Sequence, residues 1–415
     1  MKTIRALLAA LFTSCLVAHA DFALHDGDTV AFMGDSITAA RGYTKIVEHY
    51  TLMRFPERKI RFFNAGWGGD TAAGALKRLQ RDVFDRGATV VTVTFGVNDI
   101  GWGMKANDES KRIYLESLRS IIEECRAHGV RPIICSPAIT AELPDKAEQG
   151  FLQRMTDEGL ALAKSMGVET VDLQRGMREA QRRVVAANEK EKDVKKHTTL
   201  HVADGVHLNE LGHLALAFAL LKGLGAPEDV SAAEIDAGSA ALTSVNGCHI
   251  TDIRKIENGI AFVREDQGLP MTLGAFSAFN FRWVPVPQGI ARYGLTVRNL
   301  PEAEYQIVAE GRLLGKVNAK HLAEGVNLAM MTSDAFQPGG PWDAQSLIVR
   351  ELVEARDKLG QGERMESRNL PGHPQHEALQ EALKKQDEEM VTLQRAMAKP
   401  YPYHFELRRV DAAAR

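Results

Sequence analysis

The stretch FMGDSIT, residues 32 to 38, places a serine directly after a short apolar run near the start of the chain. A serine hydroxyl is a useful nucleophile only when a base removes its proton and hydrogen-bond donors stabilise the oxyanion that forms. Taken alone, Asp35-Ser36 is more typical of a helix N-cap than of a nucleophile. The G-x-S-x-G elbow of α/β-hydrolases is absent from the sequence. The role of Ser36 therefore depends on the other residues that the chain offers.

The segment ADGVHLNELGH offers a base, because Asp204 precedes His207 by three residues. This spacing lets one turn present both side chains on the same side. The carboxylate can then accept the Nδ1 proton and leave Nε2 free to take the proton of Ser36. An isolated D-x-x-H is more often a surface turn, and this alternative stays open at this point. Other histidines are nearby, but none has an aspartate at this spacing: His197, His201 and His213.

Oxyanion donors are expected from two further loops and from the serine itself. Gly69, in GWGGDTA, has no side chain to keep a substrate away from its backbone N–H. Asn98, in GVND, carries an amide N–H₂, and the backbone N–H of Ser36 at a helix start is the third donor. Trp67 and Trp102 belong to the same loops and are possible substrate-flanking residues, either as platforms for sugar rings or as plain walls.

Short apolar runs alternate with amphipathic stretches over residues 28–224, which is typical of a parallel sheet with helices on both faces. In such sheets, ligands bind beyond the carboxyl ends of the strands. Three of the expected strands end in GDSIT, NAGWGGDTA and GVNDIGWG, so we expect the candidate residues to meet at one edge. The expected strands are Thr29–Met33, Lys59–Asn64, Thr89–Phe95, Arg131–Ser136 and Thr170–Asp172, and the expected helices include Thr71–Phe84, Ser110–His128, Gly150–Met166 and Leu211–Leu224.

The ordered blocks GDSIT, NAGWGGDT, GVND and DGVH resemble those of the GDSL/SGNH hydrolase superfamily over about half of the chain. The resemblance implies a three-layer α/β/α sandwich with a central, mostly parallel sheet, and a carboxylic ester hydrolase that needs no metal or organic cofactor. It also implies Ser36 as nucleophile, His207 as general base and Asp204 as its orienting carboxylate. The oxyanion hole would consist of the backbone N–H groups of Ser36 and Gly69 and the amide of Asn98.

The expected reaction is ester hydrolysis through an acyl-enzyme on Ser36, with removal of acetyl groups from carbohydrates as the favoured case. The substrate would be a small-molecule or oligosaccharide ester. A broad esterase or lysophospholipase-type acylhydrolase is the alternative. Two other classes remain: a non-catalytic carbohydrate-binding protein, which would have no use for an acid-base pair, and a metal-dependent phosphoesterase built on Asp35, Asp70, Asp99 and His207. For Asp70 and Asp99 themselves, the favoured role is to hold their loops through backbone amides.

The first twenty residues are typical of a signal peptide, with Lys2 and Arg5 before an apolar stretch and Ala18-His19-Ala20 as a cleavage signal. We expect export, to the periplasm or the medium, after cleavage near Ala20. Lipid attachment at Cys15 is a less supported alternative. No later stretch reaches the roughly 18 to 20 apolar residues needed to span a bilayer. The net charge of −3 and the scattered basic residues do not indicate a nucleic-acid partner.

The sequence predicts four parts: a signal peptide (1–20), the hydrolase domain (21–225), a small β-rich region (226–320) and a helical region (321–415). Short β-leaning runs between Gly, Pro and Asn residues indicate a small antiparallel unit in the third part. Two helices, Ala344–Leu359 and Glu377–Met397, are expected in the fourth part, joined by the polar linker GQGERMESRNLPGHPQ. After signal-peptide cleavage, the remaining cysteines are expected to be buried thiols: Cys125, Cys135 and Cys248.

Overall fold

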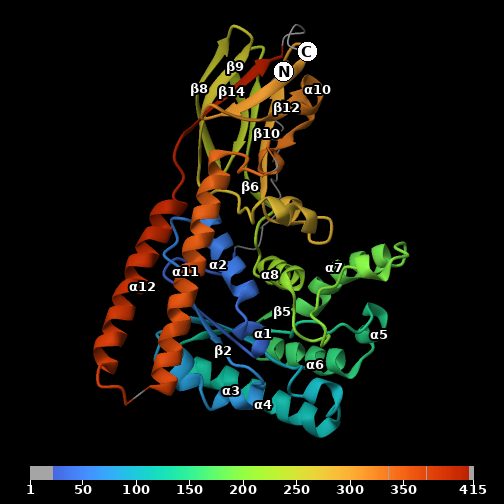
Figure 1. Ribbon diagram of the computed structural model, residues 1–415, viewed down its shortest axis with the longest axis vertical. Helices are drawn as coiled ribbons and strands as arrows, with labels where there is room; N and C mark the ends of the chain where they lie inside the picture. Colours follow the sequence, from blue (N-terminus) through green and yellow to red (C-terminus); the bar gives the residue numbers. More distant parts are fainter. Residues whose placement is uncertain (1–21, 335, 371, 411–415) are drawn as a thin grey trace, which may run out of the picture.

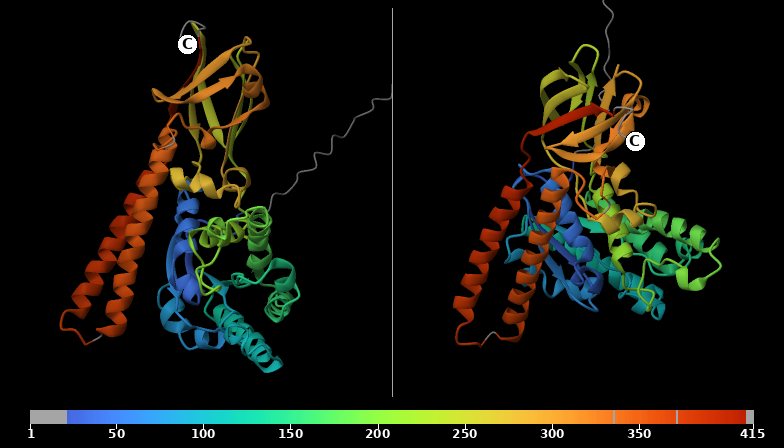
Figure 2. Two further views of the ribbon diagram at one scale, coloured as in Figure 1. Left: turned by 45° about the vertical axis from the view of Figure 1, so that its right-hand side comes forward. Right: turned by 45° about the horizontal axis from the view of Figure 1, so that its top comes forward.

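The computed structural model describes residues 22–334, 336–370 and 372–410, so the expected signal peptide lies outside the described residues. An N-terminal α/β domain lies at one end of the molecule and a β-sandwich at the other (Figure 1). A long helical hairpin descends from the sandwich along the side of the α/β domain, and both views in Figure 2 show it there. We propose that the boundary between the domain and the C-terminal part lies near residue 225.

The N-terminal domain is built on one five-stranded parallel sheet in the order β2-β1-β3-β4-β5. Because all strands run in the same direction, the loops that follow them lie at one edge of the sheet. All five expected strands are confirmed, with bounds shifted by two residues at most: β1 (Thr29–Gly34), β2 (Arg61–Gly66), β3 (Val90–Thr94), β4 (Arg131–Cys135) and β5 (Glu169–Val171).

Helices cover both faces of this sheet, which confirms the three-layer sandwich. Alternate side chains of a strand point to opposite faces, so Val30 and Phe32 of β1 enter one core and Ala31 and Met33 the other. The first core is closed by α2 (Gly42–Arg54), α7 (Leu173–Asn188) and α8 (Glu210–Gly223). The second is closed by α3 (Ala72–Leu76), α4 (Asp108–Ala127) and α6 (Phe151–Ser165), while α1 (Ser36–Ala39) and α5 (Pro144–Glu148) are short connectors.

The predicted helix over 71–84 is wrong in one respect, because it is interrupted. It consists of α3 and a π-helical turn, Gln80–Phe84, with Arg78 in the break. The guanidinium of Arg78 turns inward there and donates to the carbonyl oxygens of Gly34 and Ala65 at the ends of β1 and β2.

The C-terminal β-sandwich contains two sheets, ordered β13-β10-β6-β7 and β12-β11-β14-β9-β8. Most strand pairs are antiparallel as predicted, but β6 and β10 are parallel. The last strand, β14, pairs with β9 and β11, so the helical region predicted for 321–415 ends in a strand of the sandwich. The elements are β6 (Asp229–Asp236), β7 (Ala241–Asn246), β8 (Cys248–Ile256), β9 (Gly259–Asp266), α9 (Val286–Gly289), β10 (Arg292–Arg298), β11 (Glu304–Ala309), β12 (Arg312–Asn318), α10 (Ala319–Glu324), β13 (Val326–Asn327) and β14 (Tyr403–Arg409).

The hairpin consists of α11 (Pro341–Asn369) and α12 (His376–Ala398). The polar linker predicted over residues 360–375 is wrong in its first ten residues, which extend α11. Each glycine in a helix costs only about 1 kcal/mol relative to alanine, and tertiary contacts can exceed that cost. Two such contacts follow the glycines Gly360 and Gly362: Glu363 pairs with Arg86 at 3.3 Å, and Arg364 donates to the carbonyl oxygen of Asn64 at 2.9 Å.

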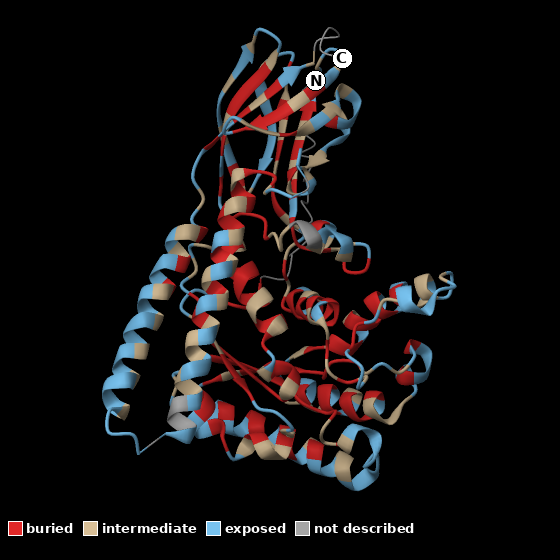
Figure 3. Ribbon diagram, in the orientation of Figure 1, coloured by how far each residue is buried: buried red, intermediate tan, exposed pale blue. Residues whose placement is uncertain are grey.

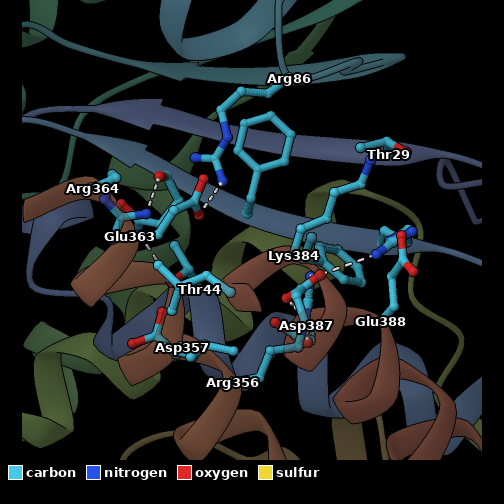
Figure 4. Close-up of a pocket in the computed structure, with 18 of the residues that line it drawn as sticks. Thr29, Thr44, Arg86, Arg356, Asp357, Glu363, Arg364, Lys384, Asp387 and Glu388 are labelled. Carbon is cyan, nitrogen blue, oxygen red and sulfur yellow. Dashed lines mark hydrogen bonds and ion pairs between the residues drawn. The ribbon is translucent and has the colours of Figure 1, made fainter. Parts of the chain in front are cut away.

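Ion pairs attach the hairpin to α2 and to β2, where Arg61 contacts Asp387 at 3.0 Å. Arg356 of α11 contacts Glu48 at 2.9 Å and Asp387 of α12 at 2.7 Å, with Arg356 and Glu48 both buried. Asp357 accepts from Arg41 at 2.8 Å. Glu48, Arg356, Asp357 and Asp387 line a cavity of about 650 Å³ beneath the hairpin (Figure 4). Figure 3 shows the contrast between the buried sheet and the largely exposed outer helix α12.

None of the described helices is long and apolar enough to cross a membrane. Cys125, Cys135 and Cys248 are buried and unpaired, as expected.

Candidate active site

Ser36 is the first residue of α1, and only Asp35 separates it from the end of β1. It therefore lies at the carboxyl edge of the sheet. Asp35 caps this helix, and its Oδ1 accepts from the N–H of Ile37 at 2.9 Å. Gly34 is required here, because a Cβ on it would lie 2.2 Å from Oγ1 of Thr38. The helix-cap interpretation and the nucleophile interpretation are thus compatible: Asp35 caps the helix while Ser36 is left half-buried at its start.

Ser36, His207 and Asp204 form one hydrogen-bonded chain. Nε2 of His207 lies 2.8 Å from Oγ of Ser36, and Nδ1 of the same ring lies 2.6 Å from Oδ2 of Asp204. The other carboxylate oxygen of Asp204 accepts from the backbone N–H groups of Val206 and His207, both at 2.9 Å. Hydrogen bonds from the His207 ring and these amides lower the pKa of Asp204 to about 2. An ionised Asp204 fixes the tautomer that leaves Nε2 free to accept from the serine.

Two of the three competing histidines are hydrogen-bonded elsewhere, and the third lies within a helix. The Nε2 atom of His201 is hydrogen-bonded to the carbonyl oxygen of Ile139 at 3.0 Å, and that of His197 to the carbonyl oxygen of Glu191 at 3.0 Å. His213 lies within α8, with its ring against Gly42.

The expected oxyanion donors lie on the loops after β2 and β3. Gly69 has a φ of +72°, a backbone conformation that favours glycine, and there is open space where a Cβ would stand. Its backbone is therefore accessible. Asn98 is held in one orientation: its Oδ1 accepts from Nε1 of Trp102 at 2.8 Å, and its Nδ2 donates to the carbonyl oxygen of Asp70 at 3.0 Å. The second hydrogen of that Nδ2 remains for another acceptor. Among the described residues, none accepts from the backbone N–H of Ser36 or Gly69.

Both tryptophans border this site but differ in their surroundings. The Trp102 ring stands edge-on to the His207 ring, with centroids 5.6 Å apart and planes at 73°. Trp102 is 47% exposed, and its φ of +57° is not helical although the residue lies within a 3₁₀ turn. Trp67 is 38% exposed, and the guanidinium of Arg81 lies 5.7 Å from its ring centre. Their exposure is consistent with contact to a ligand.

Arg78 is a residue that sequence reasoning missed. It is 7% exposed, its Nε donates to Asp70 at 2.7 Å, and its other nitrogens reach the ends of β1 and β2. It therefore ties the Gly69 loop to the strand that precedes Ser36. An arginine in a helix after a loop is usually a surface residue, so nothing in the sequence pattern distinguished it.

Buried carboxyl groups lie beneath the site. Asp99 accepts from the N–H of Ala72 at the start of α3 at 3.0 Å, as its expected structural role requires, and its Oδ2 has no hydrogen-bond partner in the described part of the chain. Burial raises the pKa of Asp99 to about 7 and that of Asp35 to about 6. The set proposed for a metal is otherwise engaged, with Asp70 paired to Arg78 and Asp35 capping α1. No group of three or more His, Cys, Asp or Glu residues in the described ranges is arranged to hold a metal ion.

The raised pKa of Asp99 predicts a pH-dependent stability. Its protonated form is favoured in the folded chain, so its contribution is complete below about pH 4 and is lost as the pH rises to about 7. Asp99→Asn removes this loss. We expect the free energy of unfolding of the variant, minus that of the parent chain, to rise between pH 4 and pH 8 by on the order of 4 kcal/mol.

Urea denaturation across this pH range measures the difference. Asp99→Ala is the matched control. It removes both the titrating carboxyl group and the hydrogen bond to Ala72, so it should show the same dependence on pH from a lower free energy of unfolding. A difference that stays flat with pH would contradict the assignment.

Comparison with known proteins gives matches to the N-terminal domain. The model of the GDSL-like lipase/acylhydrolase family matches residues 32–215. Over 121 residues, the chain is 36% identical to an uncharacterized lipoprotein of Bacillus subtilis, YqeF, and this match spans 27% of the chain and about half (49%) of that relative. An acetylxylan esterase from Geobacillus stearothermophilus is 26% identical over 228 residues, covering 48% of this chain and 94% of the esterase.

A solved structure of a gut microbial diltiazem-metabolizing enzyme superposes on nearly the whole chain, with a TM-score of 0.78 over 93% of this chain and 98% of the other. At 22% identity, this likeness shows a shared fold that includes the sandwich and the hairpin. The family-model match over residues 32–215 and the acetylxylan esterase relative support placing the N-terminal domain in the GDSL/SGNH hydrolase superfamily of esterases and acylhydrolases.

Proposed function

We propose that the protein hydrolyses carboxylic esters with Ser36 as its nucleophile, and that its substrates are acetylated carbohydrates. The observation that carries the proposal is the 2.8 Å contact between Oγ of Ser36 and Nε2 of His207, with Asp204 on the opposite side of the ring. A binding protein would gain nothing from this arrangement, because it serves to move a proton.

In the first half-reaction, Nε2 of His207 takes the proton of Ser36 as Oγ attacks the ester carbonyl carbon. The oxyanion is stabilised by the N–H groups of Ser36 and Gly69 and by Nδ2 of Asn98. Asp204 stabilises the imidazolium that forms, without taking its proton. His207 then protonates the departing alcohol, and the acyl group stays on Ser36.

In the second half-reaction, water replaces the alcohol. His207 takes a proton from the water as its oxygen attacks the acyl carbon, and the same three donors hold the second oxyanion. Return of the proton to Oγ of Ser36 releases the carboxylic acid and restores the enzyme.

Two features support a carbohydrate ester. Exposed indole rings on two loops of the site can stack on sugar rings: Trp67 follows β2, and the Trp102 ring stands edge-on to that of His207. The relative matched over 94% of its own length is an acetylxylan esterase. A second candidate, hydrolysis of apolar esters by a broad esterase, is favoured by exposed apolar side chains on the loops near His207, among them Met104 and Val202.

Export of the protein is part of this proposal, since polymeric carbohydrates do not enter a cell. The signal-peptide pattern supports it, and one relative is named a lipoprotein. N-terminal sequencing of the exported protein should begin at Asp21; a lipid-modified Cys15 would instead show the alternative processing.

Removal of the nucleophile or of one oxyanion donor should have effects of different size. Ser36→Ala should lower kcat by about 10⁴- to 10⁶-fold, because no alkoxide can form. Asn98→Ala should lower it by about 10²- to 10³-fold, the usual cost of one oxyanion donor. Steady-state hydrolysis of p-nitrophenyl acetate measures both. Ser165→Ala on the exposed end of α6 is the control and should retain activity. A folded Ser36→Ala variant with more than about 1% of the activity would refute the nucleophile.

The acyl group and alcohol can be tested together. Acetylated xylo-oligosaccharides are compared with p-nitrophenyl esters of increasing acyl length, with Ser36→Ala as the blank. We expect release of acetate from the sugars and a fall of about tenfold or more in kcat/KM beyond short acyl chains, as longer chains outgrow the acyl site. A preference for long acyl chains, without acetate release from sugars, would favour the broad esterase.

A further inference from the structure

A cavity of about 230 Å³ adjoins the loop that carries Gly69. Trp67 and Gly68, the two residues before Gly69, line one side of it, and helix α11 lines the other. Ala39, which also lines it, lies one turn of α1 after Ser36. The C-terminal hairpin therefore borders the site that the N-terminal domain forms.

One face of α11 provides this wall. Gln361, Arg364, Met365 and Asn369 line the cavity, and their spacing of three, four and eight residues places them on the same side of the helix. Gln361, Met365 and Asn369 are exposed, while Arg364 donates to the carbonyl oxygen of Asn64 in β2 at 2.9 Å. The contact from Arg364 fixes the distance between this face and the sheet.

A buried donor also lies in this cavity. Arg41 is 5% exposed, and its Nη1 donates to Asp357 at 2.8 Å. Its Nη2 has no hydrogen-bond partner among the residues that the structure describes. Buried N–H groups normally find an acceptor, so the Arg41 side of the cavity wall carries a donor that the described residues leave unsatisfied. No Asp or Glu is among the described residues that line it.

The larger cavity of about 650 Å³ lies on the other side of the contact between Arg364 and Asn64, since both residues line both cavities. Its charged groups pair with one another across the interface, as Arg86 does with Glu363 (Figure 4) and Glu48 with Arg356. This charged interface holds α11 in position, and the smaller cavity is the one that borders the loop of Gly69.

We propose that the smaller cavity binds a sugar ring on the alcohol side of the scissile ester, so that α11 determines substrate specificity. The proposal rests on carbohydrate deacetylation as the proposed function. An acetyl group has two carbons and cannot fill about 230 Å³, so the occupant belongs to the alcohol. The indole of Trp67 suits the apolar face of a sugar ring, and the amides of Gln361 and Asn369 suit its hydroxyl groups.

The test compares a substrate that reaches α11 with one that does not. Mono-O-acetylated xylotriose presents sugar rings to the cavity, whereas methyl acetate has an alcohol of one carbon. The double variant Gln361→Ala/Asn369→Ala should lower the ratio of the two kcat/KM values, xylotriose ester over methyl acetate, by about 10- to 100-fold, mainly through KM. Gln386→Ala, an exposed glutamine of the same hairpin that lines neither cavity, is the matched control and should leave the ratio unchanged.

The outcomes separate the two proposals. If the parent chain deacetylates xylotriose and the double variant keeps the ratio within about twofold, α11 does not bind the alcohol and this inference is overturned alone. If the parent chain hydrolyses methyl acetate but no acetylated sugar, the proposed function is overturned and the inference with it. Circular dichroism of each variant establishes that the overall helix content is retained, and Met365→Ala, which tests the same face with an independent side chain, should also lower the ratio.

Discussion

The hydrogen bond between Oγ of Ser36 and Nε2 of His207 joins residues 171 positions apart, and most of the N-terminal domain serves to keep them within 2.8 Å. Both lie at the carboxyl edge of a parallel sheet, where the loops after neighbouring strands converge. Ser36 is held by the N-cap of α1. His207 is held by a turn that Asp204 closes, because its carboxylate accepts from two backbone N–H groups of that turn. A slip of one strand would separate the hydroxyl from the imidazole and leave either group without its partner.

Polar groups beneath the site hold the loops that supply the oxyanion donors. Arg78 connects the Gly69 loop to the ends of β1 and β2, and Trp102 and Asp70 fix the orientation of Asn98. Burying such groups is unfavourable unless they are paired, so their presence favours a fixed arrangement of donors. Preorganised donors are effective in catalysis because they do not need to reorient when charge develops.

The sheet and the candidate residues could be predicted from the sequence because each short motif follows an apolar run that is a buried strand. Ser36 and His207 are in hydrogen-bond contact, and Asn98 is hydrogen-bonded to Asp70, the residue after Gly69. Helix α2 carried no such signal. The sheet, α8 and the hairpin cover it on several sides, so even Glu48 and His49 are buried. The polar face expected of a surface helix is therefore missing from its sequence. The position of α11 beside the site depends on ion pairs between distant segments, such as Arg41 with Asp357, which no local pattern encodes.

Covalent labelling tests most directly whether the contact with His207 activates Ser36. Diisopropyl fluorophosphate transfers its phosphoryl group to an activated serine with loss of fluoride, and peptide mass spectrometry locates the adduct. Labelling of the parent chain should occur on Ser36 alone, and the rate should fall by about 10³-fold or more in His207→Ala. Equal labelling rates in the two proteins, or an adduct on another residue, would contradict the account.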